Sequence, residues 1–171
     1  VNELYLALEK NCIDLIALQQ PVAGDLRFIA ASFKIITDLE RIADLAVNLG
    51  DYALEAERDV YPDVDIQGIG TAVGEMVSTA MTAYHDQDAA ACHEIAARDD
   101  EIDDRCERAS QDVVRDLLET QLEESTEPDI DRLMADVQRL LLTVRDLERI
   151  GDHAVNIAAR TLYMVENSDE L

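Results

Sequence analysis

The chain is poor in the residues that interrupt helices and in the aromatic residues that favour sheets. Its 171 residues include no tryptophan, two phenylalanines, three prolines and six glycines. Alanine, leucine, aspartate, glutamate and arginine dominate instead, which is typical of long helices. The composition therefore predicts an all-α protein.

Two further absences exclude broad classes of protein. No apolar run approaches the roughly 18 residues that span a bilayer, and no signal peptide is recognisable, so we expect no membrane insertion. Cysteine occurs only at Cys12, Cys92 and Cys106, an odd number without close spacing. These cysteines fit neither a disulfide framework nor a zinc knuckle, and a reducing cytoplasm is the expected location.

Positive charge is also scarce. Lysine occurs only at positions 10 and 34, and 14 basic residues accompany 38 acidic ones, so the formal net charge is −24 at pH 7. Such a surface repels phosphate backbones and anionic lipid, and we expect no direct binding to nucleic acid. The acidic residues are spread along the whole chain, which favours adaptation to high salt over a dedicated acidic binding face. We therefore expect a halophilic source.

An internal repeat organises the sequence. Residues 38–48 read DLERIADLAVN and residues 146–156 read DLERIGDHAVN, so nine of eleven positions are identical at a separation of 108 residues. A repeat of this kind indicates two copies of one structural unit. The two differing positions are Ala43 against Gly151 and Leu45 against His153.

Helical periodicity divides the chain into two repeats joined by a linker. Residues 1–60 form the first repeat with two expected helices, the second starting near Pro21. Residues 61–68 have linker chemistry, and residues 69–171 form the second repeat with three helices. We therefore predict a six-helix protein seen without its first helix, whose place would lie before Val1. The expected second-repeat helices span about 69–86, about 89–124 and from Pro128 to about Val165, with Ser125 and Thr126 as caps.

Each copy of the motif helix has an apolar seam with three-four spacing, along which we expect other helices to pack. The first seam contains Ile29, Ser32, Ile36, Leu39, Ala43, Ala46, Gly50 and Ala53. The second seam contains Leu133, Val137, Leu140, Val144, Leu147, Gly151, Ala154 and Ala158.

Beside each seam, two acids and an amide form a ladder, because positions four apart differ by about 40° around a helix. Like charges at this spacing repel by roughly 0.2–0.5 kcal/mol when exposed and by more when solvent is removed. A multivalent cation offsets that repulsion directly, and oxygen ligands favour hard ions. The expected metal is iron, zinc, manganese, magnesium or calcium. The ladders are Glu40, Asp44 and Asn48 in the first copy and Glu148, Asp152 and Asn156 in the second.

A single helix cannot supply a full coordination sphere, so further carboxylates are needed nearby. The expected preceding helix contains Asp99, Asp100 and Asp103 within the run ARDDEIDD. In the first repeat the equivalent stretch would lie mostly before Val1, and Asn2 stands at the place of Asp103. We therefore expect the second site to be the more complete one.

Two alternatives to a metal-binding regulator remain open. Arg41 and Arg149 lie three residues from motif acids, and intrahelical ion pairs would leave a metal-free scaffold. A metal-dependent enzyme is the other alternative, although the chain has no glycine-rich phosphate loop, no nucleophile elbow and no Glu-x-x-His pair. His153, beside Asp152, is read either as an extra ligand or as a polar surface group.

Three segments carry a resemblance to a known family. They are LIALQQPVAGDLRFIAASFKIITDLERIADLAVN at 15–48, ARDDEIDD at 97–104 and LLLTVRDLERIGDHAVNIA at 140–158. Their content and order resemble the PhoU family of phosphate-specific transport accessory proteins. The resemblance implies two tandem three-helix bundles of the up-down-up kind, the first lacking its first helix in this chain.

The resemblance also implies a function and partners. It implies a non-enzymatic negative regulator of phosphate uptake and signalling, which acts as an adaptor to a phosphate ABC transporter ATPase and to a sensor kinase. Self-association as a homodimer is also expected. Some members of the family bind metal clusters through E(D)-x-x-x-D motifs. By position, these motifs fall on Glu40 and Asp44, on Glu148 and Asp152, and on Asp99 and Asp103.

Overall fold

A computed structural model describes residues 1–56, 64–119 and 127–167, and all regular structure within these ranges is helical. The expectation of an all-α fold with two tandem repeats is confirmed. None of the described helices has the length and apolar character that crossing a membrane requires. The helices are α1 (Asn2–Gln19), α2 (Ala23–Glu55), α3 (Ile66–Asp86), α4 (Ala89–Glu119) and α5 (Glu127–Glu166).

The start of α3 is set by a side-chain cap. The carboxylate of Asp65 accepts a hydrogen bond from the backbone N–H of Gly68 at 2.9 Å, and Arg105 of α4 binds the same carboxylate at 3.0 Å. An Asp at the N-cap position favours a helix that starts directly after it. The helix therefore begins at Ile66, three residues earlier than the sequence predicts, and residues 66–68 of the expected linker are helical.

The turn between α3 and α4 has clear local causes. Gln87 adopts a left-handed conformation with φ of 58° and donates its N–H to the carbonyl of Ala83, which ends α3. Asp88 then accepts from the N–H groups of Ala90 and Ala91, which starts α4. These contacts fold α4 back along α3.

The ends of α4 and α5 agree with the sequence where the structure describes them. The last described residue of α4 is Glu119, so the expected extension to residue 124 lies outside the described residues. The same holds for the caps expected at Ser125 and Thr126. Because α5 begins at Glu127, Pro128 lies in its first turn as predicted.

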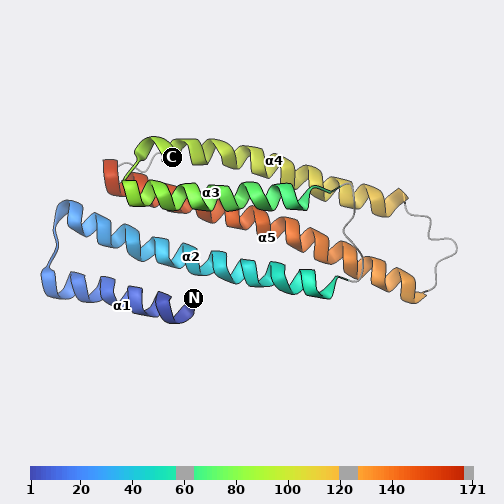
Figure 1. Ribbon diagram of the computed structural model, residues 1–171, viewed down its shortest axis with the longest axis horizontal. Coiled ribbons are helices and arrows are strands. Elements are labelled where there is room, and N and C mark those ends of the chain that lie inside the picture. Colours follow the sequence, from blue (N-terminus) through green and yellow to red (C-terminus); the bar gives the residue numbers. More distant parts are fainter. Residues whose placement is uncertain (57–63, 120–126, 168–171) are drawn as a thin grey trace.

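The long helix α5 lies at the centre of the molecule (Figure 1). Helices α3 and α4 pack on one side of it and form a three-helix bundle with it, while α2 packs along the other side. Helix α1 packs against α2 and, among the described helices, against no other. The two motif helices α2 and α5 run antiparallel, so the repeated motifs meet each other where the two repeats join.

The second repeat encloses a continuous apolar core, whereas the first repeat does not. In α1 only Cys12 is buried, and large apolar side chains such as Leu4 and Leu18 are exposed by 65% and 76%. Among the described residues, the largest fully buried apolar side chains outside α2 are Ile69, Met76, Ile95, Ile157, Leu162, Val73, Val113 and Val144.

The predicted seam is confirmed in α5 and partly wrong in α2. All eight seam residues of α5 are buried or half-buried. In α2, by contrast, Ala46, Gly50 and Ala53 are exposed, while Ile35 and Leu45 on a neighbouring face are buried. The physical reason is that the packing of α2 on α5, rather than a helix of its own repeat, decides which of its faces is buried.

Candidate functional site

Four acids gather where α4 packs on α5. Asp99 and Asp103 come from α4, and Glu148 and Asp152 come from α5. We call these four residues the α4–α5 carboxylate cluster. Both helices place their acids by four-residue spacing, so each pair lies along one helix face and the two faces meet. The structure therefore brings together residues that are about 50 positions apart in the sequence.

The acids of the cluster interact electrostatically with one another. Burial, followed by the charges of Asp103 and Asp152, raises the pKa of Asp99 to about 6, with smaller contributions from Asp100 and Glu148. The pKa of Asp103 is also raised, by burial first and then by Asp152 and Asp100. Burial, Asp103 and Asp152 raise the pKa of Glu148. Each ionised carboxylate thus increases the free energy of ionising the next.

Asp99 is held in a specific environment at the base of the cluster. Its Oδ1 atom is buried and has no hydrogen-bond partner among the described residues. A Cβ atom added at Gly151 would lie 3.2 Å from this oxygen and 3.8 Å from Cγ2 of Ile102. The glycine of the second motif therefore leaves space that the Asp99 carboxylate approaches, and the alanine of the first motif, Ala43, would not leave it.

A buried thiol lies close to the same acids. The pKa of Cys106 is raised to about 11, first by burial and then by the charges of Glu148 and Asp103. Cys106 is fully buried, and the raised pKa keeps it protonated at neutral pH. The ionisable oxygens of the cluster therefore dominate its chemistry.

The donor set fits a hard cation. A buried carboxylate oxygen without a partner, flanked by three further carboxylates, is a favourable environment for an ion such as magnesium, calcium, manganese or iron. Within the described ranges, no three Asp, Glu, His or Cys side chains are already arranged closely enough to hold a metal ion. Side-chain rotation would be needed to close a coordination sphere.

The remaining residues of the second site lie at the edge of the cluster. Asp100 is exposed and contributes to the raised pKa of Asp99 and Asp103. Asn156, one turn beyond Asp152 on α5, is half-buried. The structure thus places the predicted second-site residues on one region of the α4–α5 surface.

The first copy of the motif has different surroundings. Glu40 is half-buried and Asp44 is exposed. Asn48 donates from Nδ2 to Oδ2 of Asp146 at 3.3 Å, so its amide nitrogen is engaged with the other repeat. The helix that packs on this half is α1, where Asn2 is exposed. The structure therefore shows no counterpart of the α4–α5 carboxylate cluster within the described part of the first repeat.

Sequence reasoning missed a polar network that joins the two repeats. Asp146 is fully buried, and its Oδ1 accepts from Nε of Arg145 at 2.9 Å and from Nη2 at 2.7 Å. Its Oδ2 accepts from Asn48 and, at 3.2 Å, from the hydroxyl of Tyr52. Burial and the Asp146 charge raise the pKa of Tyr52. The repeated first aspartate of the motif is thus a structural residue at the α2–α5 interface.

His153 is a second link between the repeats, and its reading as a surface group was wrong. The side chain is buried, and its Nδ1 lies 2.9 Å from Oδ1 of Asp38, which is buried as well. One feature of the sequence could have indicated this contact, because His153 is one of the two positions at which the motif copies differ. Asp38 and Asp146 are bound by His153 and Arg145, and within the described ranges no ion pair joins Arg41 or Arg149 to either acid.

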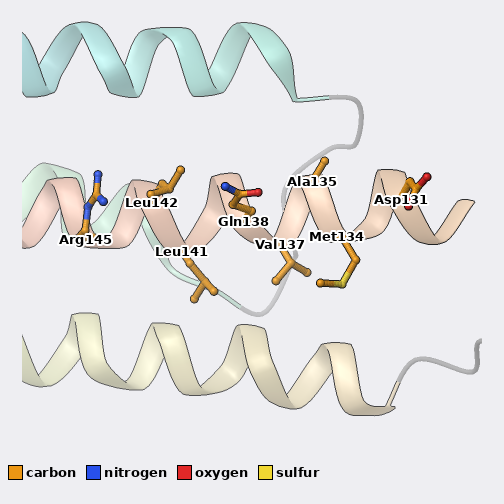
Figure 2. Close-up of a pocket in the computed structure, with 8 residues that line it drawn as sticks. All are labelled: Asp131, Met134, Ala135, Val137, Gln138, Leu141, Leu142 and Arg145. Carbon is orange, nitrogen blue, oxygen red and sulfur yellow. The ribbon is translucent and has the colours of Figure 1, made fainter. Parts of the chain in front are cut away.

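An apolar cleft lies away from the carboxylate cluster. Figure 2 shows this cleft of about 590 Å³ along the first half of α5. Five of its eight lining residues are apolar and Asp131 is its one carboxylate, so it does not gather the several oxygen ligands that a hard cation takes. The lining residues are Asp131, Met134, Ala135, Val137, Gln138, Leu141, Leu142 and Arg145.

Comparison with known proteins identifies the relatives of the chain. The PhoU domain family matches residues 1–53 and 66–161. The phosphate-specific transport system accessory protein PhoU homolog 1 of Methanothermobacter thermautotrophicus is 34% identical over 168 residues, which cover 96% of this chain and 72% of that protein. The corresponding homolog of Pseudomonas aeruginosa is 32% identical over 172 residues, covering 99% and 67%.

Solved structures agree with the sequence comparison. The crystal structure of PhoU from Pseudomonas aeruginosa matches with a TM-score of 0.86 and 31% sequence identity, covering 98% of this chain and 77% of that one. The phosphate transport system regulatory protein PhoU from Streptococcus pneumoniae matches with a TM-score of 0.81 over 98% and 74%, and at 24% identity it supports the fold alone. The chain therefore belongs to the PhoU family.

Proposed function

We propose that this protein is a non-enzymatic negative regulator of phosphate uptake that acts as a helical adaptor to a phosphate ABC transporter. The observation that carries the proposal is the relationship to accessory proteins of phosphate-specific transport systems, at 34% identity over 96% of the chain. The long helices of the protein suit this role because they present extended faces to partner proteins. A sensor kinase is the second proposed partner.

The experiment for this role measures uptake and association together. Deleting the gene in its native host is expected to increase phosphate uptake under phosphate-rich conditions, and the intact chain is expected to restore the lower rate. The transporter ATPase should co-purify with the tagged protein from the same cells. Unchanged uptake after deletion, with no ATPase recovered, would refute the proposal.

We further propose that the α4–α5 carboxylate cluster holds a metal ion through Asp99, Asp103, Glu148 and Asp152, with Asp100 and Asn156 at its edge. The support is the buried, unpartnered Oδ1 of Asp99 and the all-oxygen donor set. A bound cation would supply the positive charge that neutralises the acids and ties α4 to α5. Glu40, Asp44 and Asn48 form the proposed weaker site of the first repeat.

A direct test of the metal proposal is elemental analysis of purified protein. We expect a stoichiometric metal content that disappears when Glu148→Gln and Asp152→Asn are combined. A protein that contains no metal and is not stabilised by any of iron, zinc, manganese, magnesium or calcium would instead support the metal-free scaffold.

We also propose that the protein self-associates as a homodimer. Apolar side chains exposed on the α1–α2 hairpin, including Leu6 at 59%, Leu18 at 76% and Leu54 at 87%, support this proposal. Exposed apolar area of this kind is stabilised by association. Sedimentation equilibrium should give the mass of a dimer, and Leu6→Ser with Leu18→Ser should shift it toward the monomer. A monomer at all concentrations contradicts the proposal.

A further inference from the structure

A second cleft lies between the two motif helices, near the start of α2 and the end of α5. It has a volume of about 380 Å³ and lies where the two repeats join. Three alanines on the two helix faces leave the space open, because their methyl groups are too short to fill it. The lining residues are Ala30, Ala31 and Lys34 of α2 and Ala159, Arg160 and Tyr163 of α5.

The charge of this lining is opposite to that of the protein. The chain has 38 acidic and 14 basic residues, yet none of the described acids lines the cleft, while Lys34 and Arg160 both do. Lys34 is one of only two lysines in the whole sequence. On a protein with so many carboxylates, two cations facing a space that no described acid lines form a local exception to the surface charge.

These two cations are also not paired with acids of the described ranges. Neither Lys34 nor Arg160 forms a salt bridge with a residue in the described ranges, whereas Arg98, Arg105 and Arg145 all do. Nε of Arg160 is buried and has no hydrogen-bond partner within those ranges. A buried guanidinium nitrogen without a partner is unfavourable, and an acceptor delivered by a ligand would remove that penalty.

A second arginine stands on the same side of α2. Arg27 precedes Lys34 by seven residues, which places both on one face of the helix. Its Nε atom is likewise buried without a partner among the described residues. Arg27 is not among the residues that line the cleft, and it adds a third cation near the start of α2.

We propose that this cleft, the α2–α5 cation cleft, binds a small phosphate-bearing anion. Lys34 and Arg160 supply charge-assisted donors, and a guanidinium matches two oxygens of a tetrahedral oxyanion. The hydroxyl of Tyr163, a side chain 37% exposed, adds a neutral donor at the rim. The proposal goes beyond the regulatory role. That role requires contact with a transporter, but it does not require this protein to bind phosphate.

The position of the cleft gives such binding a physical consequence. Lys34 belongs to the first repeat and Arg160 to the second, so one anion would neutralise cations from both. The anion would thereby stabilise the packing of α2 on α5. Ligand binding would therefore change the stability of the interface between the repeats.

The test is calorimetric titration of the full chain with inorganic phosphate, after treatment with a chelator so that no metal-bound phosphate contributes. Ionic strength is kept high and constant to screen the net charge. We expect saturable binding and a raised Tm in phosphate. Lys34→Gln combined with Arg160→Gln should weaken binding by roughly tenfold or more. Pyrophosphate is titrated in parallel, and tighter binding of it would assign the cleft to condensed phosphates instead of the free ion.

The matched control removes two charges elsewhere. Lys10→Gln combined with Arg108→Gln replaces two exposed cations on α1 and α4 and should leave phosphate affinity within about twofold. If the Lys34 and Arg160 double variant does not fold, Lys34→Gln alone serves, because that side chain is exposed. Chloride and sulfate are then tested as competitors of phosphate. The proposal is overturned if neither phosphate nor pyrophosphate binds, if the two double variants bind phosphate equally well, or if chloride displaces phosphate as effectively as sulfate does.

Discussion

In the second repeat, Glu148 and Asp152 face two aspartates of α4, whereas in the first repeat Glu40 and Asp44 lie on a helix whose own-repeat neighbour is α1. The motif sequences are nearly identical, yet the second copy is part of a cluster in which three acids have raised pKa values. The comparison teaches that the helix packed against an acidic motif, and not the motif alone, determines its electrostatic character.

The largest expected difference between the copies is in metal binding. We expect the proposed metal to stabilise the wild type by about 2.7 kcal/mol at a concentration of 100 Kd. Glu148→Gln with Asp152→Asn should abolish this stabilisation, because the cluster loses half of its carboxylates. Glu40→Gln with Asp44→Asn should retain most of it. Thermal unfolding with and without metal gives the measurement, and equal losses in both variants would remove the distinction between the copies.

The next effect concerns His153, one of the two residues by which the motif copies differ. His153→Leu makes the second motif resemble the first, and it leaves the buried carboxylate of Asp38 without its partner. We expect the free energy of unfolding to fall by about 2 kcal/mol, measured by urea denaturation. Combining it with Asp38→Leu should recover part of the loss. A neutral His153→Leu variant would show that the buried pair does not stabilise the α2–α5 interface.

A smaller effect follows from the raised pKa of Asp99. Its folded-state pKa of about 6 exceeds the usual value near 3.9, so the folded state disfavours the ionised form. The contribution of Asp99 to stability therefore falls as the pH rises from about 4 to about 6. In metal-free protein at pH 7.5, Asp99→Asn should stabilise by about 1 kcal/mol after discounting for partial exposure.

This gain from Asp99→Asn should vanish near pH 4, where the wild-type side chain is already protonated. The matched control is Asp44→Asn in the first repeat, an exposed acid expected to change stability by less than about 0.5 kcal/mol. Urea denaturation across this pH range provides the comparison. A gain for Asp99→Asn that does not depend on pH would contradict the assigned cause.

The smallest expected effect is the difference in stability between substitutions at Gly151 and at Ala43. Ala43→Gly should cost about 1 kcal/mol of stability through helix propensity alone. Gly151→Ala should gain much less than that, because the new Cβ would lie 3.2 Å from Oδ1 of Asp99. We expect a net change within about 0.5 kcal/mol, together with weaker metal binding as the Asp99 carboxylate is displaced. Paired thermal melts and metal titrations test both parts, and unchanged metal affinity would show that the glycine does not serve the cluster.

Much of the fold could be predicted because it depends on local rules. The helix spacing, Pro128 in a first turn and the near-identical motifs all act within a few residues or by direct repetition. The seam of α5 was predictable from its periodicity. Because α5 packs against α2, α3 and α4, apolar residues on several of its faces are buried. The proximity of acids within α4 and within α5 followed from their four-residue spacing, while their role as metal ligands stays a prediction.

Contacts between distant residues could not be predicted in the same way. The exposed positions Ala46 and Gly50 fit a helical seam as well as the buried Leu45 does, and periodicity alone does not say which face meets α5. The pairing of Asp38 with His153 joins residues 115 positions apart. Asp146 likewise has the sequence of an ordinary motif acid, and its burial depends on Asn48 and Tyr52 from the other repeat.

By itself the sequence determined the helices, their duplication and the presence of acids at four-residue spacing, because backbone hydrogen bonding and side-chain periodicity are local. The tertiary structure decided which copy of those acids forms a cluster and which buried carboxylates bind the other repeat. It also decided that Lys34 and Arg160 face one cleft that none of the described acids lines. These outcomes depend on which helices pack together, and long-range packing is a property of the whole chain.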